Sequence, residues 1–179
     1  MTLQSRVLQY QAVIRAELES GVEIGELSGV IARMAELHVA GELNGQLPTV
    51  VHQSGFDVIA KNGERVSVKS IARMGFDRDV PKFNPRTQHH IDRAVIVAID
   101  PVTAEPRIIY NALFTELKPL LNANGYVRLH RVVAAEVIHE LAVRAAAGGT
   151  CGQVWPAYDA PHSKDEPVSV AKALELLQT

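Results

Sequence analysis

The sequence contains very little cysteine and no long apolar run, and both shortages narrow the class of protein. Cys151 is the single cysteine, so an internal disulfide cannot form, which favours a reducing compartment. Residues 1–11 lack the apolar run of a secretory signal peptide, and no window reaches the length of a membrane-spanning helix. We therefore expect a cytoplasmic protein that is not associated with a membrane.

The sequence also lacks a strong excess of charge of one sign. Its formal net charge is −2 over 179 residues, so the molecule as a whole does not have the composition of a nucleic-acid-binding protein. The stretch 61–93 is different, because its bases outnumber its acids: Lys61, Arg65, Lys69, Arg73, Arg78, Lys82, Arg86 and Arg93 against Glu64, Asp77, Asp79 and Asp92. This stretch is either a solvated surface of mixed charge or a positive rim beside a site that handles phosphate.

Several motifs with well-understood chemistry are absent. His89 and His90 are adjacent, but no Cys or further His stands at a spacing typical of zinc sites, so we interpret them as exposed loop residues. No His-Glu-x-x-His sequence occurs, which gives no support to a zinc protease. Gly148 and Gly149 are not followed by Gly-Lys-Ser/Thr, so they are not a phosphate-binding loop.

The chain does contain enough apolar material, 47% of its residues, for a sizeable core. Helical periodicity predicts helices over 3–19, 25–43 and 131–147, with a short one within 112–121, and apolar alternation or β-branched runs predict strands over 56–60, 64–71, 93–99 and 106–110. The loop at 72–90 is long and polar. We expect a single α/β domain over 1–148, followed by a Pro- and Gly-rich arm with a short helix at 149–179.

The first two strands are predicted to form a hairpin that brings an acid and an amine together. Asn62-Gly63 between two apolar runs favours a tight type I′ turn, in which both central residues have positive φ. Asp57 lies on the first strand, while Ser67 and Lys69 alternate onto one face of the second. We expect Asp57 and Lys69 to meet at one end of a sheet.

This order of elements resembles the PD-(D/E)xK nuclease superfamily, and in particular bacterial domains in which a helical glutamate precedes a "GFD…xxK" hairpin. The residues that carry the resemblance are Glu36 in the second predicted helix, Gly55-Phe56-Asp57, and Ser67-Val68-Lys69; it covers roughly residues 25–115. It implies a restriction-endonuclease-like core, with a central mixed sheet of four to five strands flanked by helices.

The resemblance also implies roles for these residues. Glu36 and Asp57 would hold a Mg²⁺ or Mn²⁺ ion, and Lys69 would act near the scissile phosphate. The superfamily usually has a second acid two residues before the lysine, where this chain has Ser67. Glu36 is one substitute for the missing charge, and the carbonyl oxygen of Val68 is a further ligand to consider.

The resemblance therefore leads to the hypothesis of metal-dependent hydrolysis of DNA phosphodiesters, with RNA as a less favoured substrate. The residues expected along the approach to the site are Arg65, Arg73, Lys82, Arg86, Gln88 and His89. A homodimer is plausible, because cutting both strands of a duplex needs two sites. The alternative is a nuclease fold without turnover that binds nucleic acid or another protein, and Ser67 and the acidic net charge favour it.

Overall fold

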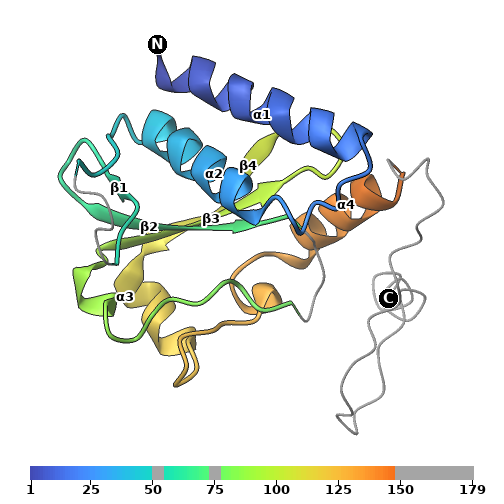
Figure 1. Cartoon of the computed structure of the whole chain (residues 1–179). Coiled ribbons are helices and arrows are strands. Elements are labelled where there is room, and N and C mark those ends of the chain that lie inside the picture. The colour runs from blue at the N-terminus through green and yellow to red at the C-terminus, as the bar shows by residue number, and fades with distance from the viewer. Residues whose placement is uncertain (50–54, 73–77, 148–179) are drawn as a thin grey trace, which may run out of the picture.

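The computed structural model describes residues 1–49, 55–72 and 78–147 and shows a mixed sheet between two layers of helices and loops (Figure 1). Helices α1 (Leu3–Glu19) and α2 (Ser28–Glu42) cover one face of the sheet. The opposite layer holds α3 (Phe114–Leu117), α4 (Ala135–Ala147) and three short 3-10 turns at Gln88–His90, Lys118–Leu120 and Leu129–Arg131. The class is thus α+β, as the sequence predicted.

The sheet contains β1 (Val58–Ile59), β2 (Arg65–Ile71), β3 (Arg93–Ile99) and β4 (Pro106–Leu113) in sequence order. β1 pairs with β2 and β3 pairs with β4 in antiparallel fashion, whereas β2 and β3 are parallel. The prediction of a mixed sheet of four to five strands is confirmed, with four strands in the described residues. The sheet is therefore two hairpins that lie side by side through their parallel inner strands.

The N-terminal helices follow the periodicity of their sequences. Thr2 caps α1 by accepting a hydrogen bond from the Ser5 N–H at 3.1 Å, and α1 ends before Ser20 as predicted. One face of α1 packs on a single hydrophobic cluster through side chains at helical spacing: Leu3, Val7, Tyr10, Ile14 and Leu18. α2 adds Ile31, Met34 and Leu37 to that cluster, so these two helices form one apolar layer.

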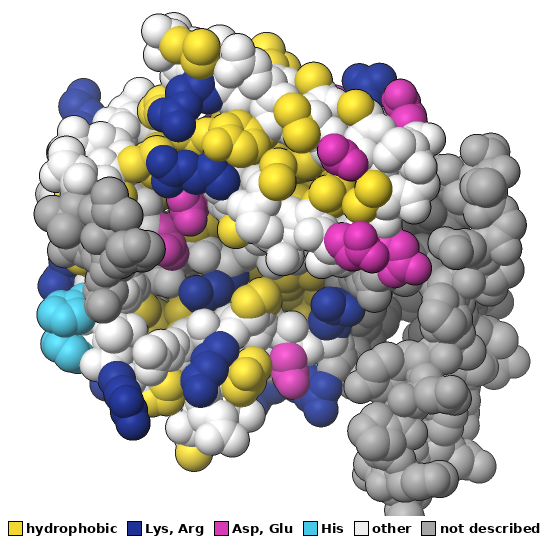
Figure 2. All heavy atoms as spheres, in the orientation of Figure 1, with side chains coloured by type: hydrophobic (Ala, Val, Ile, Leu, Met, Phe, Trp, Pro, Cys, Tyr) yellow, Lys and Arg dark blue, Asp and Glu magenta, His cyan; other side chains and the backbone are white. Residues whose placement is uncertain are grey.

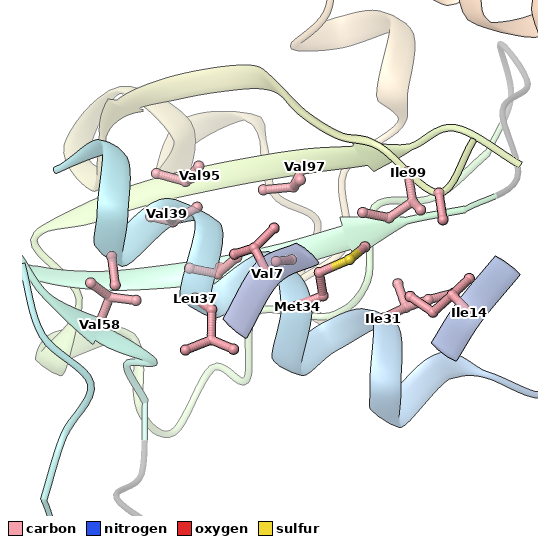
Figure 3. Close-up of a cluster of buried hydrophobic side chains, with 14 of the residues drawn as sticks. Val7, Ile14, Ile31, Met34, Leu37, Val39, Val58, Val95, Val97 and Ile99 are labelled. Atoms are coloured by element: carbon pink, nitrogen blue, oxygen red, sulfur yellow. The ribbon is translucent and has the colours of Figure 1, made fainter. Parts of the chain in front are cut away.

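Both faces of β3 are buried, as its uninterrupted apolar sequence indicated. Val95, Val97 and Ile99 point toward α1 and α2, where they meet Met34 and neighbouring side chains (Figure 3). The alternate β3 residues Ala94 and Ile96 belong to a second cluster on the opposite face, with Phe83, Phe114, Leu117 and Ile138. The sheet thus separates two cores, and each layer of helices is held to it by its own core.

The turn of the first hairpin differs from the prediction. Positive φ occurs at Gly63 (87°) but not at Asn62, which excludes a type I′ turn. The Gly63 N–H donates to the Ala60 carbonyl, and the Ala60 N–H donates to the Glu64 carbonyl, both at 2.9 Å. The loop therefore has three residues with a single left-handed position, because the pairing begins one residue earlier than a two-residue turn requires.

The described part of the long connection between β2 and β3 is well packed, although it is largely irregular. Val80 and Phe83 are buried, and their N–H groups donate to the carbonyls of Val127 and Gly125 at 2.9 Å. The segment 78–92 is thereby fixed against 125–129, and it forms much of the lower layer in Figure 1.

The remaining element boundaries are partly as predicted. β4 extends to Leu113, beyond the predicted end at Tyr110, and α4 begins at Ala135 rather than at 131. The predicted arm and short helix within 149–179 lie outside the described residues. None of the helices within the described ranges has the length and apolar content required to cross a bilayer.

Candidate functional site

Asp57 lies where β1 separates from β2. Its N–H still donates to the Val66 carbonyl at 2.8 Å, but the strand pairing extends no further in that direction. One carboxylate oxygen of Asp57 then accepts the next available backbone N–H of β2, that of Val68, at 2.8 Å. The Ser67 hydroxyl donates to the same oxygen at 3.4 Å. The side chain of Asp57 thus takes the place of a strand partner, and β2 orients its carboxylate.

Ser67 is almost completely buried, with 2% exposure. Its hydroxyl is directed at Asp57 rather than at solvent, so it supports the carboxylate and does not add a second negative charge. Glu64 does not supply that charge either, because its carboxylate binds the guanidinium of Arg93.

Lys69 lies two residues further along β2. Its ammonium group is 5.3 Å from the centroid of the Phe83 ring, a cation–π distance, and Phe83 is buried. Within the described ranges, Lys69 forms no ion pair with a carboxylate. The amine is therefore oriented by an aromatic ring and is not neutralised by direct contact with an acid.

Glu36 approaches from α2, and its charge is coupled to those of the hairpin. Burial raises the pKa of the Glu36 carboxyl, the hydrogen bond from Arg33 lowers it, and the negative charge of Asp57 raises it again. The positive charge of Lys69 also lowers this pKa. The charges of Asp57 and Lys69 are therefore close enough to Glu36 to influence its ionisation, and we call Glu36, Asp57 and Lys69 the candidate site.

Arg33 is a member of this group that the sequence analysis did not identify. One of its guanidinium nitrogens is 2.7 Å from a carboxylate oxygen of Glu36, one helical turn away. The spacing i, i+3 was visible in the sequence, but it is common on exposed helix faces and does not by itself indicate a site.

The 3-10 turn that contains Gln88 and His89 lies next to the site. Gly55, two residues before Asp57, has φ +102°, and a Cβ atom added there would lie 2.9 Å from the Thr87 carbonyl oxygen and 3.1 Å from the His90 Cβ. Only glycine suits this backbone conformation and this close approach. Gln88 itself donates to the Phe83 carbonyl at 3.1 Å, so its amide has a structural partner.

The other residues predicted to contact nucleic acid fall into three groups. Lys82 and Arg86 lie together on the lower layer, where they line a shallow hollow of about 460 Å³ with Asn84 and Pro85. Arg65 is bound through its side chain and its N–H to the carboxylate of Asp92, so two hydrogen bonds from the guanidinium would have to be exchanged for contact with a phosphate. Arg73 lies outside the described residues.

A cavity of about 380 Å³ opens at the end of β2 rather than among Glu36, Asp57 and Lys69. It lies between the start of α2, the end of β2 and the segment 78–81, and its lining includes Ile31, Ser70, Ile71 and Arg78 but not Glu36, Asp57 or Lys69. Figure 2 shows this face of the molecule: acidic and basic side chains adjoin on the upper helical layer, and Lys and Arg side chains gather on the lower layer across a hollow.

The donor set for a metal ion is small. In the part of the chain that the structure describes, no three His, Cys, Asp or Glu side chains gather closely enough to hold an ion together. Any ion in the candidate site would therefore rely on the Glu36 and Asp57 carboxylates and on water. Mg²⁺ suits such a site, because it prefers oxygen ligands and usually keeps several waters.

The chain matches no protein-family model, and no curated protein matches its sequence.

Proposed function

We propose that this protein is a Mg²⁺-dependent nuclease that hydrolyses phosphodiester bonds of DNA, with RNA as the less favoured substrate. The observation that carries the proposal is the position of the Asp57 carboxylate, which precedes β1 and is held on β2 by the Val68 N–H at 2.8 Å, one residue before Lys69. The charges of Asp57 and Lys69 both influence the pKa of Glu36 on α2. The resemblance to the PD-(D/E)xK superfamily and the mixed sheet are consistent with it.

The carboxylates of Glu36 and Asp57 are the proposed metal ligands. In each, one oxygen is engaged, by Arg33 in Glu36 and by Val68 and Ser67 in Asp57, and no described residue donates to the other oxygen. These two remaining oxygens suit a cation that retains part of its hydration shell. A bound Mg²⁺ ion would lower the pKa of a water molecule and neutralise charge on the phosphate.

The other residues position the substrate and stabilise charge. The β2 backbone holds the Asp57 carboxylate in a single orientation, so this ligand needs little rearrangement. Lys69 places an ammonium group near the point where negative charge accumulates on the phosphate during attack. Lys82 and Arg86 provide positive charge along the approach, and two copies of the chain would be required to cut both strands of a duplex.

The experiment compares cleavage of a supercoiled plasmid and a labelled single-stranded oligonucleotide in Mg²⁺ or Mn²⁺ by the wild-type protein and by Lys69→Ala. Loss of the ammonium should reduce cleavage by at least about tenfold, since one positioned group of this kind contributes of order 10²-fold to such reactions. Lys61→Ala is the matched control, because Lys61 is an exposed lysine in the turn of the same hairpin. Equal cutting by all three proteins would reveal a contaminant and contradict the proposal.

A second candidate is a nuclease fold that binds nucleic acid or a protein without turnover. It is favoured by Ser67, which stands where a second acid is expected, and by the pairing of Glu36 with Arg33. Metal affinity separates the two candidates: the nuclease should bind Mn²⁺ measurably and lose this binding in Asp57→Ala, whereas the binding module need not bind the ion at all.

A further inference from the structure

Arg33 forms an ion pair with Glu36, one of the two carboxylates on which the proposed metal site depends. Its guanidinium contacts Glu36 through one nitrogen at 2.7 Å, and the side chains of Arg33 and Glu36 are 41% and 23% exposed. Arg33 is the more exposed partner, so water reaches and screens this ion pair, which then contributes only modestly to stability. The pair is therefore strong enough to orient both side chains and weak enough for a divalent cation to displace the guanidinium.

The formal charges of the site balance when no ion is bound. Glu36 and Asp57 contribute two negative charges, and Lys69 and Arg33 contribute two positive charges. A site with no net charge attracts neither a cation nor a polyanion strongly over a distance. A divalent ion that replaced Arg33 on Glu36 would leave the group with two net positive charges, which complement a phosphodiester backbone.

We propose that Arg33 is a positioning residue that holds Glu36 in the metal-free site and turns to a substrate phosphate once a divalent cation binds Glu36. This inference rests on the proposed nuclease function. Arginine suits both partners, because its planar guanidinium pairs with carboxylates and with phosphates in the same forked geometry. The half-exposed side chain has solvent on one side, so it is not locked onto α2 by packing.

This exchange couples the two binding events. A metal ion on Glu36 releases the Arg33 guanidinium, which can then bind a phosphate. A phosphate that holds Arg33 in turn leaves Glu36 open to the metal ion. Each ligand must then increase the affinity of the protein for the other by the same factor. Removal of Arg33 should tighten binding of the ion alone and weaken the coupling between ion and nucleic acid.

The test is isothermal titration of Mn²⁺ into the wild-type protein, Arg33→Gln and Arg33→Lys, with and without a 12-nucleotide single-stranded DNA whose integrity is checked on a gel afterwards. Without DNA, Arg33→Gln should bind Mn²⁺ roughly 1.5- to 5-fold more tightly, the range that follows from the usual worth of an exposed ion pair. In the wild-type protein, DNA should increase the affinity for Mn²⁺. In Arg33→Gln, this increase should be much smaller or absent. Arg33→Lys keeps the charge and should restore the Mn²⁺ affinity of the wild type without DNA.

Arg15→Gln is the matched control, because it removes an exposed arginine from α1 and changes the net charge equally. It should leave both the affinity and the coupling unchanged. Unaltered Mn²⁺ affinity and coupling in Arg33→Gln, in a wild-type protein that binds Mn²⁺ and cuts DNA, would overturn this inference alone. A wild-type protein that binds no Mn²⁺ would overturn the proposed function, and the inference with it.

Discussion

Asp57 is expected to have two separable roles, one in stability and one in metal binding. Asp57→Ala removes the acceptor of the Val68 N–H, which now sits 2.8 Å from the carboxylate. A hydrogen bond to a charged group contributes about 1.5–3 kcal/mol, and the lower end applies because Asp57 is half-buried and water can reach the freed N–H. A loss of about 1.5 kcal/mol in the free energy of unfolding corresponds to a fall in Tm of about 3–6 °C for a chain of this length.

Asp57→Asn separates the two roles, because an amide oxygen still accepts the Val68 N–H but carries no charge. We expect its unfolding free energy to fall by less than about 0.5 kcal/mol, while both variants lose Mn²⁺ binding. Urea denaturation gives the stabilities and isothermal titration gives the affinities. The reasoning is refuted if Asp57→Asn is destabilised as much as Asp57→Ala, or if either variant binds Mn²⁺ like the wild-type protein.

Two further predictions concern the surroundings of the site. Gly55→Ala places a Cβ atom on a backbone with φ +102°, within 2.9 Å of the Thr87 carbonyl oxygen. The free energy of unfolding, measured by urea denaturation, should therefore fall by about 1–3 kcal/mol. An unchanged urea midpoint would contradict this expectation. Hydrogen bonds from Arg65 lower the pKa of Asp92 from its ordinary 3.8 to about 2. Ionised Asp92 therefore stabilises the fold fully at pH values above 3.8, and this stabilisation is lost as the pH falls through about 2. Asp92→Asn should therefore raise the midpoint pH of acid unfolding, measured by circular dichroism, and an identical midpoint would argue against the pairing.

The elements that present the candidate site were predictable because their sequences carry strong periodic signals. The apolar positions of α2 repeat at helical spacing, which places Glu36 on a flank of the helix rather than in the core. The hairpin was predicted from two apolar runs around Asn62-Gly63, although its loop proved to have three residues. These signals depend on local burial and turn preference, which a single sequence expresses well.

The details that give the site its chemistry were not predictable. The strand predicted over 56–60 has register partners in β2 only at Val58 and Ile59, and the Asp57 N–H makes the last backbone hydrogen bond before the strands separate. This early separation leaves the Val68 N–H for the Asp57 carboxylate. The length of a strand pairing depends on where the rest of the chain draws it away from its neighbour. The contact of Lys69 with Phe83 joins β2 to a connection that has no periodicity of its own.

The pairing of β2 with β3 has a consequence for the order in which the molecule folds. Within each hairpin the partner strands are neighbours in sequence, whereas the parallel pair joins Val66 to Arg93 across a long connection. Closing that connection costs chain entropy, so pairing of β2 with β3 should be the slow step of folding. Arg33, Glu36 and Asp57 precede both strands of this pair, and Lys69 lies on β2 itself, opposite Ile96. Lys82, Phe83 and Arg86 lie in the connection between the two strands, which is fixed against residues 125–129. Amide hydrogens of the β2–β3 pairing should therefore exchange only when the β1–β2 hairpin comes apart from the β3–β4 hairpin. The same opening would separate Glu36 and Asp57 from Lys82 and Arg86.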